Sequence, residues 1–281
     1  MDQINLNAWI DRSDTATGLV AEQQARLIHA VLGAADSKPP RSGDPMPHLW
    51  HWYAFPQNNS MAELGEDGHP KLGSFLPPLR LNRRMWAGGK LTFIAPLYVG
   101  EALSRRTVIT DIKQTAGSAG EMVIIRLDHE IHGAQGLALV ERQDIVYLQI
   151  PERYHPPKKT ACPEAPDLHR SVRVSTPLLF RYSAITFNAH RIHYDLPYTQ
   201  EVEHYPDLVV HGPLQAQLLM DLATEVRGAA PKTFAYRGVH PLFAQDALSL
   251  CAVKSSSTVW AMTANANGQH QTMQANVEWE I

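Results

Sequence analysis

Hydrophobic positions near the N-terminus repeat with the spacing of an α-helix. Between residues 20 and 32 an apolar side chain comes every three or four residues, at Ala21, Ala25, Ile28 and Leu32. This spacing places the apolar side chains on one face of a helix. Gly33 follows directly and suits the helix end, because glycine tolerates the backbone conformations found there. The pattern therefore predicts an amphipathic helix over 20–32.

Farther along, the hydrophobic period becomes that of a β-strand. Alternating and β-branched residues between 90 and 147 predict three or four antiparallel strands, with turns at Gly117–Gly120 and Gly133–Gly136. In the C-terminal half the same pattern predicts strands over 172–183, 247–267 and 271–281.

One further helix is predicted in the C-terminal half, over residues 213–226. Its apolar positions cover most of the circumference, which indicates a helix buried on several sides. Gly212 and Pro213 suit its start, and Gly228 suits its end.

The segments between these elements divide the chain in two. Residues 36–90 are rich in Pro and Gly but hold too many aromatic side chains for a disordered linker, so we expect an ordered region that lines or covers something. Residues 151–167 are rich in Pro and charge and poor in pattern. We predict an N-terminal domain over 1–155, a linker over 156–168 and a C-terminal domain over 169–281. A buried helix wrapped by an antiparallel sheet makes each an α+β domain of hot-dog type.

Composition and charge narrow the function. Of the 281 residues 44% are hydrophobic and 19% are charged, as in a soluble globular enzyme. The net charge of −3 argues against nucleic acid as a partner, which requires a dense basic patch. Cys162 and Cys251 are too few for a disulfide framework or a metal-ligand motif, and residues 1–14 lack the features of a signal peptide. No stretch has the length of a membrane span. We therefore expect a cytoplasmic protein with no metal site.

The densest group of chemically active side chains lies between residues 181 and 195. There Asn188, His190 and His193 offer an amide and two imidazoles, which can hold a water molecule and exchange protons near neutral pH. His211 and Gly212 open the second predicted helix, whose first N–H groups can stabilise a developing oxyanion. Together these groups suit enolate chemistry on a thioester.

This stretch, with the segment 209–220 behind it, resembles the signature of the MaoC-like, (R)-specific enoyl-CoA hydratase family. Residues 81–93 and the strands after them are similar to the subgroup with two hot-dog domains in one chain. That subgroup includes 3-hydroxyacyl-thioester dehydratases and mesaconyl- and itaconyl-CoA hydratases. The resemblance implies a double hot-dog fold, a degenerate N-terminal domain that shapes the acyl pocket, a catalytic C-terminal domain and a homodimer.

In that family an Asp and a His, five residues apart, hold the catalytic water. His193 matches the His, but Asn188 stands at the position of the Asp, and an amide cannot take a proton. Either His193 is the only acid–base group, or another group such as His190 assists. We expect His193 and Asn188 to hold the water and the N–H of Gly212 to bind the thioester oxygen. His190 and His211 either contact the substrate or brace the loop.

The arginines are candidates for binding a substrate carboxylate or a CoA phosphate through their planar guanidinium groups. The candidates are Arg84, Arg181, Arg191 and Arg237, with Arg83 beside them. We predict a hydratase of short acyl-CoA thioesters, with mesaconyl- or itaconyl-CoA preferred and citramalyl-CoA as product, and no cofactor beyond the CoA of the substrate. The alternatives are a fatty-acid-type 3-hydroxyacyl-thioester dehydratase, a thioester hydrolase and a non-catalytic acyl-CoA-binding protein.

Overall fold

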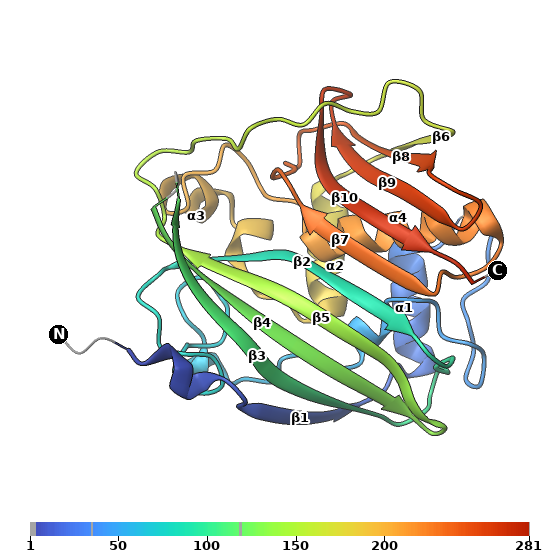
Figure 1. Ribbon diagram of the computed structural model, residues 1–281, viewed down its shortest axis with the longest axis horizontal. Coiled ribbons are helices and arrows are strands. Elements are labelled where there is room, and N and C mark those ends of the chain that lie inside the picture. Colours follow the sequence, from blue (N-terminus) through green and yellow to red (C-terminus); the bar gives the residue numbers. More distant parts are fainter. Residues whose placement is uncertain (1–3, 35, 118–119, 281) are drawn as a thin grey trace.

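Ten strands form one antiparallel sheet in the computed structural model, which describes residues 4–34, 36–117 and 120–280 (Figure 1). Their order is β1-β3-β4-β5-β2-β7-β10-β9-β8-β6. Each half of the chain contributes five strands with the same internal order, read inward from the sheet edge. The halves meet where β2 pairs with β7, with Gly88 opposite Arg237. This arrangement confirms the α+β class and the double hot-dog fold.

The first half contains one α-helix and five strands. The helix is α1 (Glu22–Leu32), and the strands are β1 (Ser13–Gly18), β2 (Arg83–Phe93), β3 (Leu103–Gly117), β4 (Gly120–Gly133) and β5 (Gly136–Leu148). Three short 3-10 helices accompany them, η1 (Leu6–Trp9), η2 (Trp50–Tyr53) and η3 (Met61–Glu63).

The second half contains more helix. Its helical elements are α2 (Thr176–Thr186), η4 (Arg191–His193), α3 (Leu196–Glu201) and α4 (Gly212–Arg227). Its strands are β6 (Leu168–Val172), β7 (Thr233–Gly238), β8 (Leu248–Lys254), β9 (Val259–Ala266) and β10 (His270–Glu278).

Helix α4 is the central helix of the second half. It packs against β7, β8, β9 and β10, and Leu214, Leu219 and Leu222 are fully buried. Burying a leucine side chain of this kind is worth about 2 kcal/mol. The same hydrophobic core includes Ile28 of α1 and Tyr182 of α2, so the three helices and the sheet share one core. The helices predicted over 20–32 and 213–226 are thereby confirmed.

The strand predicted over 172–183 is wrong for most of its length. Strand β6 ends at Val172, and α2 begins at Thr176. The side chain of Ser175 accepts a hydrogen bond from the N–H of Leu178, and a proline occupies the first turn. An N-terminal cap followed by proline favours a helix. The short apolar run alone does not distinguish a helix from a strand.

Other boundaries shift by smaller amounts. Strand β2 already begins at Arg83, so the loop-rich region ends before Gly88 and Gly89, which lie beside a β-bulge. The turn at Gly133–Gly136 is confirmed. At the other predicted turn, residues 118–119 lie outside the described residues, as do residues 1–3 of the N-terminal segment. The domain boundaries at 155 and 169 stay a prediction. Within the described ranges, no helix combines the length and apolarity needed to cross a membrane.

Candidate active site

The loop that holds Asn188 and His193 begins with a sharp backbone turn. Helix α2 ends at Thr186, and the next residue, Phe187, has a φ of 51° in the left-handed region. This conformation costs a non-glycine residue about 1 kcal/mol or more. The turn sends the chain back over the molecule. Two contacts then fix the loop. Arg191 pairs with Asp195 at 2.7 Å, and the hydroxyl of Tyr194 donates to the carbonyl of Ala189 at 3.0 Å.

A loop from the first half of the chain presses directly against this segment. Gly68 has a φ of 88°, and a Cβ built on it would lie 1.8 Å from the carbonyl oxygen of Ala189. Only glycine permits this close approach. Beside it the N–H of Arg191 donates to the carbonyl of Asp67 at 2.9 Å. The first half therefore contributes Asp67 and His69 to the site, two residues that the sequence reasoning missed.

His193 is held in the tautomer that a general base requires. Its Nδ1 lies 2.7 Å from the carbonyl oxygen of Val209. A carbonyl only accepts, so Nδ1 carries the proton and Nε2 keeps a lone pair. Burial lowers the pKa of His193 to about 4, against the opposing effect of the Val209 hydrogen bond. His193 is therefore a neutral, fixed acceptor at physiological pH.

Asn188 has the capacity to position a water molecule. Its Oδ1 accepts the backbone N–H of His190 at 3.0 Å, and its own N–H donates to the carbonyl of Ser183 at 2.8 Å. These bonds fix the residue at the end of α2. One lone pair of Oδ1 and the two N–H bonds of Nδ2 stay available. The amide has both donor and acceptor capacity for water, and it cannot exchange protons with it.

His211 and Gly212 bring the start of α4 to the catalytic loop. The His211 ring stacks on the His193 ring with centroids 3.7 Å apart, and its Nε2 lies 2.8 Å from the hydroxyl of Ser183. Gly212 begins the helix, where the first N–H groups have no partner within the helix. A Cβ on Gly212 would come 2.8 Å from the ring of Trp86. The helix start is therefore narrow, and it carries the positive end of the helix dipole.

Four imidazoles form a continuous group, called here the histidine cluster: His69, His190, His193 and His211. The rings of His190 and His193 are 5.3 Å apart, and those of His69 and His190 are 4.3 Å apart. Burial lowers the pKa of His69, His190 and His211 well below the usual value. Nε2 of His190 and Nδ1 of His211 are buried without a hydrogen-bond partner. Buried polar atoms of this kind are rare in native proteins unless a ligand or water satisfies them.

The candidate arginines lie in different surroundings. Nη1 of Arg84 lies 3.2 Å from Nδ1 of His69, which places it at the histidine cluster. Arg191 braces the loop through Asp195. Arg181 on α2 and Arg237 on β7 are exposed.

Asp67, His69 and His190 could also be considered as metal ligands. Each offers one ligand atom, and these atoms lie within 4.8 Å of one another. Arg84, however, lies at hydrogen-bond distance from His69, and its guanidinium cannot be deprotonated in a protein. A fixed positive charge opposes the binding of a cation, so this group suits an anion better than a metal ion.

On the first-half side, an aromatic wall borders the start of α4. The Trp86 ring stacks on Tyr236 at 4.4 Å and meets Trp52 edge to face at 5.7 Å. The indole N–H of Trp52 donates to the buried carboxylate of Glu141 at 2.9 Å. Trp52 and Trp86 therefore anchor the core and the neighbouring loops.

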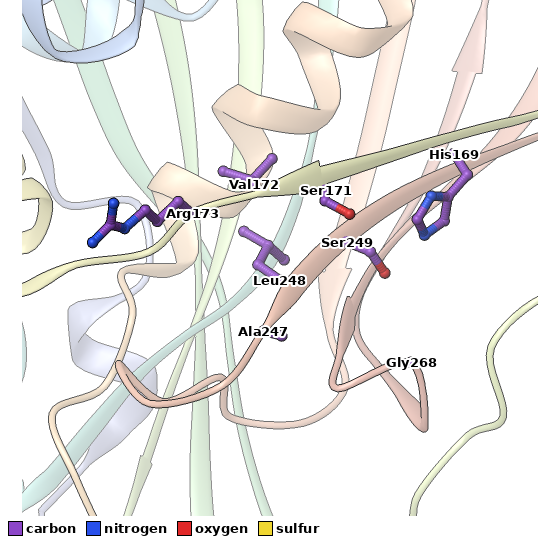
Figure 2. Close-up of a pocket in the computed structure, with 8 residues that line it drawn as sticks. All are labelled: His169, Ser171, Val172, Arg173, Ala247, Leu248, Ser249 and Gly268. Carbon is purple, nitrogen blue, oxygen red and sulfur yellow. The ribbon is translucent and has the colours of Figure 1, made fainter.

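A hollow of the surface lies elsewhere. Figure 2 shows a groove at the sheet edge, formed by β6, β8 and the turn at Gly268. No residue of the histidine cluster lines it, and its charged side chain, Arg173, points away from the others. This groove is therefore separate from the group of functional side chains around His193.

Comparison with known proteins identifies the family of the chain. A model of the hydroxyacyl-thioester dehydratase type 2 family matches residues 49–244. Over 248 residues the chain is 39% identical to mesaconyl-C4-CoA hydratase of Chloroflexus aurantiacus, and the match covers 86% of this chain and 87% of the relative. The matched family segment includes the catalytic loop and most of the first-half residues described above.

Solved structures extend the fold over nearly the whole chain. A MaoC-like dehydratase of Phytophthora capsici matches with a TM-score of 0.72 at 13% identity, over 99% of both chains. A Mycobacterium tuberculosis protein with a double hot-dog fold matches with a TM-score of 0.59, also at 13% identity, over 95% of both chains. At such identities the likeness shows the fold alone.

Proposed function

Because the chain belongs to the hydroxyacyl-thioester dehydratase type 2 family, we propose that it is a hydratase that adds water across the double bond of a short enoyl-CoA. The preferred substrate is mesaconyl-C4-CoA, and the product is citramalyl-CoA. This choice is supported by 39% identity to a mesaconyl-C4-CoA hydratase. Itaconyl-CoA, an isomeric C5 thioester, is a second substrate in this proposal.

The reaction uses His193 as its acid–base group. Nε2 of His193 takes a proton from a water molecule that Asn188 orients, and the water oxygen bonds to the β-carbon. The electrons of the double bond move toward the thioester carbonyl, whose oxygen becomes an enolate oxygen at the N–H of Gly212. His193 then returns the proton to the α-carbon. Atoms and charge balance without a second acid, so an amide at position 188 is sufficient.

The observation that carries this proposal is the hydrogen bond from Nδ1 of His193 to the carbonyl of Val209. It leaves only Nε2 to accept a proton. The stacking of His193 on His211 keeps that base beside the first turn of α4. This proximity supports the roles of base and oxyanion donor that the proposal gives to His193 and Gly212, because addition of water to a thioester requires both.

Hydration by this route needs neither a metal ion nor an organic cofactor. Every step is assigned to His193, Asn188 or Gly212, and the charge of Arg84 disfavours a cation at Asp67, His69 and His190. We expect kcat/KM to be unchanged after dialysis against EDTA and after addition of Zn²⁺ or Mg²⁺. A loss of activity on chelation that is restored by one metal would contradict this assignment.

The cellular setting follows from the same proposal. Cys162 and Cys251 are free thiols, which supports a reducing compartment such as the cytoplasm. A homodimer is proposed from the family resemblance, with no role for nucleic acid or membrane. Sedimentation at several concentrations measures the mass, and a monomer throughout would contradict the dimer.

The experiment that tests the function offers mesaconyl-C4-CoA, itaconyl-CoA and crotonyl-CoA to the protein in ¹⁸O-labelled water. Mass spectrometry then identifies the product. We expect citramalyl-CoA with one labelled oxygen on the former β-carbon. Release of free CoA with label in the carboxylate would instead show a thioester hydrolase. Binding of all three thioesters without conversion would show an acyl-CoA-binding protein.

The family match also supports a second candidate function, dehydration of 3-hydroxyacyl thioesters of fatty-acid type. The same residues would act in the reverse direction. Turnover of 3-hydroxybutyryl-CoA or crotonyl-CoA, with no turnover of the dicarboxylyl thioesters, would favour this candidate.

A further inference from the structure

We propose that Arg84, together with His69 and His190, forms the subsite that binds a carboxylate on the β-carbon of the substrate. This inference rests on the proposed function, because it places the free carboxylate of a dicarboxylyl-CoA. In this proposal, the residues that distinguish dicarboxylyl from simple acyl thioesters lie mainly in the first half of the chain.

Geometry places this subsite next to the catalytic base. The His193 ring adjoins His190 at 5.3 Å, His190 adjoins His69 at 4.3 Å, and Nη1 of Arg84 lies 3.2 Å from Nδ1 of His69. The His193 ring also stacks on the His211 ring, with centroids 3.7 Å apart, and His211 directly precedes the start of α4. The cluster therefore runs from the oxyanion donor, through the base, to a guanidinium.

The substrate has the same order of groups. In mesaconyl-C4-CoA the free carboxylate is bonded to the carbon that receives the water. A group that binds this carboxylate must therefore lie within a few ångströms of the base, on the side away from the thioester carbonyl. His190 lies directly beside the base, and Arg84 is joined to His190 through His69. In crotonyl-CoA a methyl group takes the place of the carboxylate.

Arg84 is free to bind an anion, whereas its neighbour is not. Nε of Arg83 pairs with Glu203 at 2.8 Å, and Arg83 also donates to the carbonyl of Glu203. Both residues are buried. For Arg84, no ion pair with an Asp or Glu is found within the described ranges of the chain, and its contact is to an imidazole. Arg84 is half-buried and acts on the Asp67 carboxyl without pairing with it, so its planar guanidinium keeps donors for a bound carboxylate.

Two further features favour an anion here. Nε2 of His190 is buried and has no partner, so a carboxylate oxygen would satisfy it when it carries the proton. Because Nδ1 of His69 accepts from Arg84, the proton of that ring is on Nε2, which can also donate. Asp67 is the acidic member of this group of residues. Burial raises the pKa of Asp67, against the backbone hydrogen bond from His69 and the charge of Arg84.

The test uses two thioesters of equal length that cannot be hydrated, succinyl-CoA and butyryl-CoA. They differ only in a terminal carboxylate or methyl group. Isothermal titration calorimetry on the full chain gives Kd for both. We expect the wild type to bind succinyl-CoA at least about 10-fold more tightly, because hydrogen bonds to charged groups are roughly twice as strong as neutral ones. Arg84→Gln should abolish this preference and leave the Kd of butyryl-CoA within about twofold.

The controls separate a specific effect from a general one. Lys90→Gln removes a positive charge from an exposed position of the same strand, and the preference should be kept. Arg84→Lys keeps the charge without the planar fork and should give an intermediate preference. If Arg84→Gln does not fold, the reduced preference of Arg84→Lys decides the question.

Each result has a defined meaning. Equal affinity of the wild type for both thioesters, or an unchanged preference in Arg84→Gln and Arg84→Lys, overturns the subsite. Neither result contradicts hydration, because the two ligands are not turned over. Failure of the wild type to bind either thioester overturns both the subsite and the proposed function.

Discussion

The two halves of the sheet each bury a polar group that contains histidine. The central carboxylate of the first group has its hydrogen-bond partners, although Nε2 of the neighbouring His129 has none. In the first half the carboxylate of Glu141 accepts hydrogen bonds from His51, Trp52 and Gln143 at 2.7–2.9 Å. In the second half His190 and His211 each keep a buried nitrogen without a partner. A satisfied group stabilises the fold, whereas an unsatisfied one has capacity left for a ligand.

The helices also differ between the two halves. Before β7 the chain forms α4, which has 16 residues and starts at Gly212 beside His211. At the corresponding place before β2, the described residues form only the short helices η2 and η3. The first half therefore has no long helix start there to stabilise an oxyanion. Its loops instead reach across to the second half, where Asp67 and His69 complete the site.

The largest expected effect separates chemistry from stability. His193→Ala should lower kcat by about two to four orders of magnitude, because one positioned acid–base group contributes that much. The free energy of unfolding should change far less than the rate. Steady-state kinetics and urea denaturation on the same preparation measure both. A kcat within tenfold of the wild type would contradict the assignment of the base.

Glu141→Ala should show the opposite behaviour. Removing one partner of a buried, hydrogen-bonded pair costs about 3–5 kcal/mol of folding free energy. Urea denaturation measures the loss. Glu130→Ala, at an exposed position of β4, is the control for removal of a glutamate. A loss of less than about 1 kcal/mol would show that this group does not stabilise the first half.

Gly212→Ala tests the start of α4. The added Cβ would approach Trp86 to 2.8 Å, and Trp86 is held by its stacking on Tyr236. The helix start must then shift, and losing one oxyanion donor costs about 10²–10³ in kcat. Gly238→Ala is the control, because its Cβ would stay 3.6 Å from the nearest atom. Wild-type kcat in Gly212→Ala would contradict the oxyanion assignment.

The smallest expected effect is a displaced pH profile. His193 acts as the unprotonated form, and burial lowers its pKa to about 4. The acid limb of kcat/KM should therefore have its midpoint near pH 4 instead of near pH 6.5. In Glu141 burial favours the neutral form, but the hydrogen bond from His51 prevails and lowers the pKa to about 2. The stability from that carboxylate is complete above about pH 4.5 and is lost only as the pH falls toward 2. A midpoint near 6.5 would contradict the environment assigned to His193.

The sequence was sufficient for residues that lie close together along the chain. Asn188, His193 and Gly212 were predicted because a short motif and a helix start carry them. The central helix was predicted because its apolar residues follow a strong period. The helix over Thr176–Thr186 was mistaken for a strand, because its cap at Ser175 outweighs an ambiguous apolar pattern.

Residues brought together by the tertiary fold could not be predicted. Asp67 and His69 lie in a turn more than a hundred residues before His190, and nothing in their local pattern indicates the contact. Gly68 gave the one local sign, a glycine between two polar residues. Arg84 was one of five arginines with equal claims, and only the packing of β2 places it at the histidine cluster.

Chemical rescue of His193→Ala tests the central claim most directly, because it asks whether an imidazole base at this position performs the hydration. The rate of mesaconyl-C4-CoA hydration is measured for the variant with increasing imidazole, and for wild type as control. We expect added imidazole to raise the rate of the variant at least about tenfold, with saturation, and to leave the wild type unchanged. A folded variant that hydrates mesaconyl-C4-CoA at the wild-type rate without imidazole would contradict the account.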